Sequence, residues 1–215
     1  MARFERKYKI MGLEPETIAG NLMLHPAGFR VLHPDRQVNN IYFDTIDLTT
    51  FHQNVAGINQ RKKFRMRWYG EKVKKLKKPQ FEIKIKHNEL GTKKVIKCEN
   101  LKFKNLEKIT ELANKYSENF APLYPTLLNA YTRSYYGSAD GKFRVTIDRN
   151  LNYYSLLGQS EFLGYRVEEP GVILEVKYDE SDDQVAGFVL QNLPYRHTKS
   201  SKYVNGVSMT SIFLQ

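Results

Sequence analysis

The sequence Asn-Gln-Arg-Lys-Lys-Phe-Arg-Met-Arg-Trp-Tyr, at residues 59–69, carries more structural information than any other part of the chain. Cations and apolar residues alternate along it, with Arg61, Lys63, Arg65 and Arg67 on one parity and Phe64, Met66 and Trp68 on the other. Because strand side chains point to opposite faces with a period of two, this predicts a strand with one cationic and one apolar face. Same-face neighbours lie about 6.6 Å apart, so their like charges repel and the row requires an anion nearby.

One-sided charge recurs in other segments that we expect to be strands. The aligned residues are Glu5, Lys7 and Lys9; Glu82, Lys84 and Lys86; Tyr131 and Arg133; Arg144, Thr146 and Asp148; and Glu175 and Lys177. Two arrangements explain this pattern. Either the charged faces point to solvent, or the sheet closes into a barrel whose lumen they line while helices cover its apolar outside. A lumen of this kind can hold only a compact polyanion together with a metal ion, because arginine forks bind phosphate oxygens bidentately. Periodicity alone leaves both arrangements open.

Composition limits the classes of partner. The chain has 215 residues and a formal net charge of +11, from 34 Lys plus Arg and 23 Asp plus Glu. Such an excess favours nucleic acid, polyphosphate, nucleotides or an anionic membrane surface, and it does not choose among them. The lysine-rich residues 71–79 are expected to form a mobile hairpin tip, either simply solvated or guiding a polyanion by long-range attraction.

The sequence favours a soluble cytoplasmic protein. Cys98 is the only cysteine, so no intramolecular disulfide can form. The first residues, Met-Ala-Arg-Phe-Glu-Arg-Lys-Tyr, are charged from the third onward, unlike a signal peptide. No apolar run approaches the roughly 20 residues that a bilayer crossing requires.

Hydrophobic periodicity predicts an α+β protein with one domain over residues 1–215. Strands are expected at 4–10, 29–32, 38–44, 58–69, 81–86, 93–97, 127–136, 142–148 and 172–178. Helices are expected at 14–24, 48–55, 105–120 and 182–193, and again near the C-terminus. Pro34-Asp35 is expected to form a turn, and Asp47 to cap the second helix.

Eight short motifs, in order along the chain, resemble the VTC domain. They are Glu-Arg-Lys-Tyr (5–8), Tyr-Phe-Asp-Thr (42–45), Arg-Met-Arg (65–67), Phe-Glu-Ile-Lys (81–84), Tyr-Thr-Arg (131–133), Phe-Arg-Val-Thr-Ile-Asp (143–148), Leu-Glu-Val-Lys-Tyr (174–178) and Ser-Lys-Tyr (201–203). This family includes polyphosphate polymerases and belongs to the triphosphate tunnel metalloenzymes, relatives of the CYTH phosphatases. The resemblance extends from Phe4 to about Tyr203. It implies a single tunnel domain at 1–215, built as a closed antiparallel β-barrel with helices packed on its outside.

The resemblance also implies roles for individual residues. The phosphate-binding residues would be Lys7, Arg65, Arg67, Lys84, Lys93, Arg133, Arg144, Lys199 and Lys202, with the loosest match at Lys93. Of these, Arg65, Arg67, Lys84, Arg133 and Arg144 would be catalytic. Glu175 matches the acidic ligand of a divalent metal, Mn²⁺ or Mg²⁺; an ion pair with Lys177 is the alternative. Glu5 is either a second ligand or a partner for lysines, and Glu82 is interpreted as a lysine partner.

One departure from the related phosphatases bears on the reaction. Many tunnel phosphatases begin with Glu-x-Glu-x-Lys, in which paired carboxylates hold a metal, whereas this chain reads Glu5-Arg6-Lys7. Fewer carboxylates leave less scope for positioning a hydrolytic water, which favours the polymerase branch. The inositol-phosphate-sensing domain and membrane helices of eukaryotic relatives have no counterpart here. We therefore expect any membrane-protein partner to be encoded elsewhere.

The prediction is a polyphosphate polymerase-like, metal-dependent phosphotransferase. It would move the terminal phosphoryl group of a nucleoside triphosphate such as ATP onto a growing polyphosphate chain inside a basic tunnel open at both ends. The alternatives are a tripolyphosphatase or nucleoside triphosphatase on the same fold, and a non-catalytic polyphosphate-binding module. Sequence-specific nucleic-acid binding is not expected, because no recognition-helix or RRM-type signature occurs. The histidines at 25, 33, 52, 87 and 197 lack the spacing of metal ligands.

Overall fold

The computed structural model describes residues 3–88, 90–104, 106–117, 120–158 and 165–211. Its strands are β1 (Arg3–Ile10), β2 (Arg30–Asp44), β3 (Gln60–Tyr69), β4 (Lys75–Leu76), β5 (Gln80–His87), β6 (Leu90–Lys97), β7 (Leu101–Lys102), β8 (Tyr124–Gly137), β9 (Arg144–Ser155), β10 (Arg166–Glu169) and β11 (Val172–Asp179). Its helices are α1 (Pro15–Met23), α2 (Thr49–Val55), α3 (Leu106–Tyr116), α4 (Asp183–Gln191) and α5 (Lys202–Ser211), with a 3₁₀ turn at Glu180–Asp182. None of the helices in these ranges combines the length and apolar character of a membrane span.

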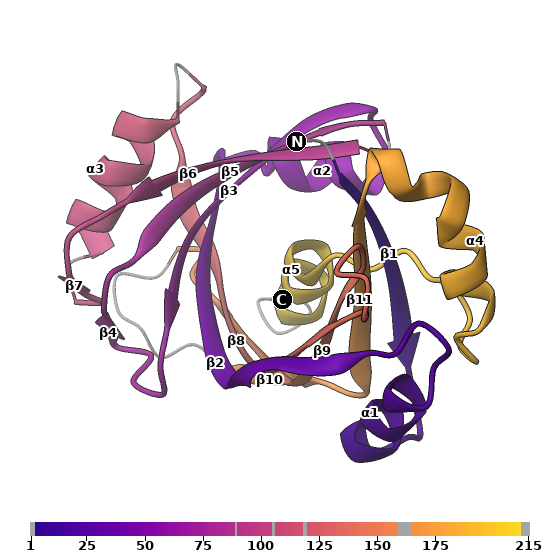
Figure 1. Ribbon diagram of the computed structural model, residues 1–215. Coiled ribbons are helices and arrows are strands. Elements are labelled where there is room, and N and C mark those ends of the chain that lie inside the picture. The colour runs from indigo at the N-terminus through magenta and orange to yellow at the C-terminus, as the bar shows by residue number, and fades with distance from the viewer. Residues whose placement is uncertain (1–2, 89, 105, 118–119, 159–164, 212–215) are drawn as a thin grey trace.

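Eight antiparallel strands close into a ring (Figure 1). Their order is β9-β11-β1-β6-β5-β3-β2-β8, and β8 pairs with β9 to complete the circuit. The contact between β1 and β6 is the shortest in the ring, a single register pair of Arg3 with Gly91. Ring closure gives every strand of the circuit an inner and an outer face, so the parity of a residue decides which face it occupies.

The apolar parity of β3 packs on the outside of the ring. Phe64, Met66 and Trp68 are fully buried in a cluster with Ile109 and Ala113 of α3. The cationic parity points inward, and only 7% of Arg67 is exposed. The alternative in which the charged faces point to solvent is therefore wrong for this strand.

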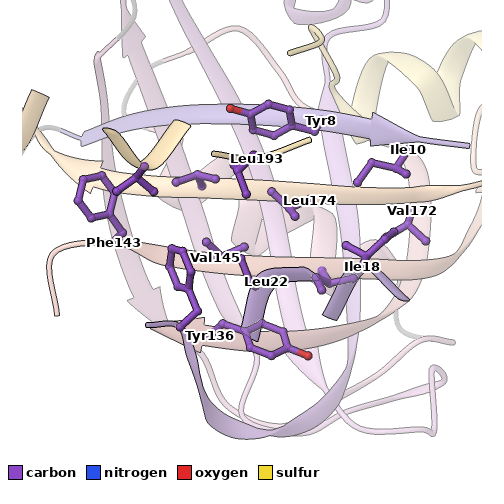
Figure 2. Close-up of a cluster of buried hydrophobic side chains, with 14 of the residues drawn as sticks. Tyr8, Ile10, Ile18, Leu22, Tyr136, Phe143, Val145, Val172, Leu174 and Leu193 are labelled. Atoms are coloured by element: carbon purple, nitrogen blue, oxygen red, sulfur yellow. The ribbon is translucent and has the colours of Figure 1, made fainter. Parts of the chain in front are cut away.

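A second outer cluster (Figure 2) lies on the side of the ring that carries α1 and α4, across from α3 in Figure 1. Val145, Leu174 and Tyr8, from β9, β11 and β1, pack under α1 and α4. Ile18 of α1 and Val189 of α4 are buried against this part of the sheet. Together with α3, these helices cover the outer faces, as expected from the sequence.

The expectation that every helix lies outside the ring is wrong for α5. In Figure 1, α5 is seen within the outline of the ring. Its residues Tyr203 and Val207 pack on Leu127, Tyr131 and Tyr153, whose parity places them on inner faces. These inner-face side chains are largely apolar, so they must be shielded from water, and only an element inside the ring can shield them.

Three polar contacts fix α5 in this position. The Tyr203 hydroxyl donates to Asp44 at 2.5 Å, and the Asn205 amide donates to Glu169 at 2.8 Å. Lys202 forms an ion pair with Asp148 at 2.6 Å. The carboxylate of Asp44 also accepts from the backbone N–H groups that begin α2. The two helices are thereby tied to one buried carboxylate.

Gly206 is expected to tolerate no side chain. A Cβ atom there would lie 2.4 Å from Leu127 Cδ2 and 2.5 Å from Tyr153 Cδ1, and the Tyr153 ring is fully buried. Gly206→Ala should therefore lower the free energy of unfolding by about 1–3 kcal/mol through overpacking. Urea denaturation would measure the change. Gly187→Ala in α4 is the matched control, because its Cβ would meet nothing within 4 Å; equal effects of the two changes would contradict the packing described.

Three local expectations are wrong. Residues 30–44 form one strand, because Pro34 and Asp35 make a bulge opposite Ser134, where the missing N–H of proline costs no ladder bond. Asp44, instead of Asp47, caps α2, since Leu48 adopts φ 55° and turns the backbone N–H groups of the first turn toward Asp44. The lysine-rich loop is not simply solvated: its β4 pairs with β7, and Leu76 is fully buried in the apolar cluster that contains Phe64 and Ile109.

Strand and helix ends also differ from expectation. β9 continues seven residues past Asp148, to Ser155, and its second half pairs with β10, which the sequence pattern did not indicate. The third helix begins at Leu106 and ends at Tyr116. Of the range expected for it, residues 105, 118 and 119 lie outside the described residues.

Candidate functional site

The inner faces of the ring surround a strongly cationic cavity of about 90 Å³, which we call the inner cavity. Eight cations and two carboxylates line it: Lys7, Lys63, Arg65, Arg67, Lys84, Arg133, Lys177, Lys202, Glu5 and Glu175. Tyr42, Tyr131, Ser201 and Tyr203 complete the lining. These side chains come from β1, β2, β3, β5, β8, β11 and the start of α5. Ring closure thus brings together residues that lie far apart in the sequence.

The two arginines of β3 are held by different partners. Arg65 Nε donates to Glu82 Oε2 at 2.6 Å, and Lys93 donates to the other oxygen of Glu82 at 2.9 Å. Arg67 donates to Asn40 Oδ1 at 2.7 Å and to the Tyr131 hydroxyl at 3.2 Å. Burial acts to raise the pKa of Glu82, but Arg65, Arg67 and Lys93 lower it far below its usual range. The carboxylate therefore stays ionised and orients Arg65.

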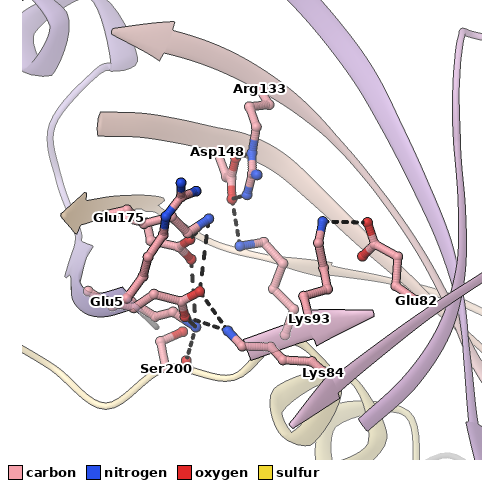
Figure 3. A network of polar contacts seen from close by, with 12 residues as sticks. Glu5, Glu82, Lys84, Lys93, Arg133, Asp148, Glu175 and Ser200 are labelled. Carbon is pink, nitrogen blue, oxygen red and sulfur yellow. Dashed lines mark hydrogen bonds and ion pairs between the residues drawn. The ribbon is translucent and has the colours of Figure 1, made fainter. Parts of the chain in front are cut away.

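Glu5 and Glu175 face three lysines across one wall of the cavity (Figure 3). Lys84 donates to both oxygens of Glu5 at 2.6 Å, and Lys177 forms an ion pair with Glu175. Lys7 lies 3.7 Å from Glu175 and 4.0 Å from Glu5. Burial and the Glu175 carboxylate act to raise the pKa of Glu5, yet the three lysines lower it to about 2. Both carboxylates are ionised at neutral pH, because burial of Glu175 is likewise outweighed by its cationic neighbours.

Arg133 of β8 lines the inner cavity. It donates to both oxygens of Asp148, from Nε at 2.5 Å and from a terminal nitrogen at 2.7 Å. Lys202 shares the same carboxylate and lies 4.9 Å from the centre of the Tyr131 ring. Asp148 is fully buried, and its cationic partners overcome the effect of burial to lower its pKa to about 2. Asp148 therefore holds the two positive charges of Arg133 and Lys202 in fixed positions.

The cavity holds more positive charge than its carboxylates neutralise. Burial, together with Lys7 and Lys84, lowers the pKa of Lys63 well below its ordinary value. Burial lowers the pKa of Lys84 to about 8, with Lys7 and Lys177 adding to the shift and Glu5 and Glu175 opposing it. Crowded ammonium groups of this kind are stabilised when a polyanion binds among them.

Ten residues predicted to act at the site are distributed unevenly. The structure brings seven of them to the inner cavity: Lys7, Arg65, Arg67, Lys84, Arg133, Glu175 and Lys202. Lys93 does not line the inner cavity; it pairs with Glu82, the carboxylate that also holds Arg65. Arg144 is exposed at the first residue of β9, and Lys199 is exposed in a neighbouring cavity.

That neighbouring cavity, which we call the outer cavity, measures about 560 Å³. It shares five lining residues with the inner cavity: Glu5, Lys7, Lys63, Lys84 and Ser201. Arg61, Lys86 and Lys199 add positive charge to its walls. A polyanion in the inner cavity therefore has a cationic path leading outward.

Several lining residues were not among the predicted site residues. Lys63 belongs to the same-parity row as Arg65, and Lys177 to that of Glu175, so strand periodicity alone could have identified both. Tyr42 and Tyr203 belong to two of the motifs that resemble the VTC domain, but no role at the site was predicted for them. Tyr42 lies opposite Arg65 in the pairing of β2 with β3, and the Tyr203 ring of α5 stacks on the Tyr42 ring with centroids 5.2 Å apart.

The donor set bears on whether a metal ion fits. Among the described residues, no group of three or more His, Cys, Asp or Glu side chains is placed to hold a metal by itself. Glu5 and Glu175 are two ionised carboxylates on one cavity wall. Mg²⁺ and related hard cations are commonly held by one or two carboxylates, with phosphate oxygens and water completing the shell. The residues present fit a cation that binds together with a phosphate ligand.

Comparison with known proteins gives one family and a set of similar folds. The model of the VTC domain family matches residues 13–211. No curated protein sequence matches the chain. Among solved structures, a candidate adenylate cyclase from Vibrio parahaemolyticus has a TM-score of 0.57 at 14% identity, covering 97% of this chain and 98% of that chain. The PH1819 protein from Pyrococcus horikoshii has a TM-score of 0.56 at 12% identity, covering 99% and 98%.

A third solved structure is similar over the same length. HpAC1 from Hippeastrum, a candidate adenylyl cyclase described as having a dominant triphosphatase activity, has a TM-score of 0.50 at 15% identity. The match covers 98% of this chain and 97% of that chain. At these identities the three structures establish the fold alone.

Proposed function

Because the chain belongs to the VTC domain family, we propose that it is a polyphosphate polymerase-like phosphotransferase acting on a nucleoside triphosphate. The observation that carries the proposal is the inner cavity, in which eight cations surround two carboxylates. The cations outnumber these carboxylates, so the inner cavity favours a compact polyanion such as a triphosphate. In this proposal the ring is a closed tunnel and the outer cavity is its exit for the growing chain.

The reaction needs alignment more than covalent chemistry. A terminal oxygen of the polyphosphate attacks the γ-phosphorus of the nucleotide, the bond to the β-phosphate oxygen breaks, and the nucleoside diphosphate leaves. Arg65, Arg67 and Arg133 line the inner cavity and would hold the equatorial oxygens, over which negative charge is spread in the transition state. Lys63 and Lys84 continue the positive wall toward the outer cavity, where the attacking chain would lie.

A divalent cation, Mn²⁺ or Mg²⁺, would be held by Glu175, with Glu5 as the second carboxylate of the same wall. Bound there, the cation would supply Lewis-acid stabilisation of the negative charge that develops on the leaving diphosphate. The lysines around both carboxylates hold them ionised and ready to bind it. Fixed orientation of Glu175 comes from Lys177 and Lys7.

Product analysis tests the proposal. The purified chain is incubated with ATP and Mn²⁺, and the products are resolved by size over time. Growth of polyphosphate chains supports the polymerase. A protein that binds polyphosphate but turns over no nucleotide with any divalent metal would be a binding module instead.

The second candidate is a tripolyphosphatase or nucleoside triphosphatase. Its support is the juxtaposition of Glu5 and Glu175, which supplies two carboxylates where the first strand alone offered one. HpAC1, with its triphosphatase activity, has a similar fold. Release of orthophosphate without any lengthening of chains would favour this candidate in the same experiment.

Affinity for tripolyphosphate is expected to fall as pH rises through about 8, the pKa of Lys84 in the free protein. A bound polyanion favours the ammonium form, so above that pH binding must take up a proton, and the affinity falls accordingly. Calorimetric titrations in two buffers of different ionisation enthalpy, one unit below and one unit above this pH, would measure the uptake. Lys84→Arg should reduce it, because the guanidinium stays charged. Equal proton uptake by the unmodified protein and by Lys84→Arg would contradict the placement of Lys84.

A further inference from the structure

The cationic rows of two strands each continue into a tyrosine. On the inner parity of β3, Arg65 and Arg67 are followed by Tyr69, and on that of β8, Arg133 is followed by Tyr135. Each tyrosine lies about 6.6 Å beyond its arginine, one same-face step along the strand. Tyr69 is 39% exposed and Tyr135 is half-buried. The two rings therefore lie just outside the phosphate-binding cations.

Arg36 joins the two rings into one cluster. It lies on β2, the strand between β3 and β8, and shares the inner parity of Val38. Its guanidinium carbon is 5.8 Å from the centre of the Tyr69 ring and 5.7 Å from that of the Tyr135 ring. We call Arg36, Tyr69 and Tyr135 the rim cluster. None of these three residues takes part in the phosphoryl transfer proposed for the inner cavity.

The rim cluster and the outer cavity lie toward opposite ends of β3. Arg61, at one end of the cationic row, lines the outer cavity, and Tyr69 is the last residue at the other end. Of the described residues that line the outer cavity, His197 alone carries an aromatic ring. The Arg61 end of the cationic row is therefore suited to binding charged groups alone, and the Tyr69 end to binding flat aromatic groups.

We propose that the rim cluster binds the base of the nucleoside triphosphate, which rests on the proposed function of the inner cavity. The ribose separates the base from the phosphates, so the base must lie beyond the last phosphate-binding cations, where the rim cluster is. Tyrosine rings and a guanidinium plane are the groups on which nucleobases stack. The nucleotide then enters with its base at the Tyr69 end, and polyphosphate leaves past Arg61.

The test compares AMP-PNP, a non-hydrolysable ATP analogue, with inorganic tripolyphosphate, both in MgCl₂ and both measured by calorimetry. Tyr69→Ala and Tyr135→Ala should each weaken AMP-PNP binding about tenfold, the effect of losing one stacked ring. Both variants should bind tripolyphosphate as the unmodified protein does, since that ligand has no base. Tyr69→Phe, which keeps the ring, should retain AMP-PNP affinity. Tyr124→Ala is the matched control, an exposed tyrosine at the opposite end of β8.

Each outcome has a separate meaning. Unchanged AMP-PNP affinity in both alanine variants, or an equal loss for AMP-PNP and tripolyphosphate, would overturn the assignment of the base site while leaving the triphosphate site intact. Failure of the unmodified protein to bind tripolyphosphate would instead overturn the proposed function, and the base site with it. Melting curves of the variants would show that the change in affinity does not come from loss of the fold.

Discussion

Arg65→Ala is expected to lower turnover of the nucleoside triphosphate by about 10²–10³-fold, the usual cost of removing one group that stabilises charge in a transition state. Arg65 lines the inner cavity and is oriented by Glu82 at 2.6 Å, so its guanidinium is held in place before any ligand arrives. Steady-state kinetics with ATP and calorimetry with tripolyphosphate would measure the loss of turnover and of binding. Unchanged affinity for tripolyphosphate would remove Arg65 from the site.

Loss of stability could also lower the activity of an Arg65 variant, and a second variant separates the two effects. Removal of Arg65 leaves Glu82, which is 1% exposed, with Lys93 as its remaining close ion-pair partner in the part of the chain that the structure describes. Breaking a buried pair by removing one member costs about 3–5 kcal/mol, because the other charge stays buried. In the double variant Arg65→Ala with Glu82→Gln, the buried charge is neutral, so stability should recover. Activity should stay low, and recovery of both would assign Arg65 a structural role only.

Strand periodicity was the most informative part of the sequence, because it fixes the face on which a residue lies. The alternation in residues 59–69 correctly predicted that Arg65 and Arg67 share one face and Phe64 and Trp68 the other. The order of strands around the ring could not be predicted in the same way. The closure of β1 on β6 rests on one register pair between residues 88 positions apart, and no local pattern encodes such a contact.

The position of a residue along its strand was a second feature that the parity of side chains could not predict. Arg144 has the parity of Asp148, yet it is the first residue of β9 and lies exposed beyond the cavity, whereas Asp148 is fully buried. Position within the strand depends on tilt and register, which are set by pairing with β8 and β11. Parity therefore selected the right face for Arg144, and the register placed it outside the inner cavity.

The position of α5 was missed for a different reason. Apolar residues on inner faces, such as Leu127 and Tyr153, look in sequence like any alternating strand, and nothing local says that a helix covers them. Gly206 is the position where the helix approaches the strands closely, but a lone glycine in a helical segment does not by itself indicate a close approach. Without the position of α5, Tyr203 could not have been assigned to the cavity.

Glu175→Gln is expected to lower metal-dependent turnover by about 100-fold or more, through loss of the carboxylate that would hold the divalent cation. The same change should leave tripolyphosphate binding without metal unchanged or tighter. Lys177 and Lys7 lose their shared counter-charge when Glu175 becomes neutral, so both are freed to interact with the polyanion. Kinetics over a range of Mn²⁺ concentrations, alongside calorimetry in a chelator, would measure the two quantities separately.

Loss of metal-dependent turnover without loss of metal-free binding distinguishes a metal ligand from a structural carboxylate. If Glu175 served only to pair with Lys177, neutralising it would change turnover and metal-free binding in the same direction, and Mn²⁺ dependence would be preserved. Glu169→Gln provides a matched control, because Glu169 is buried and pairs with Lys9 at 2.8 Å but does not line the inner cavity. Because Asn205 of α5 donates a hydrogen bond to Glu169, this change should lower the stability of the protein. The apparent affinity for Mn²⁺ should stay unchanged. Preserved Mn²⁺ dependence in Glu175→Gln would assign the metal to another group.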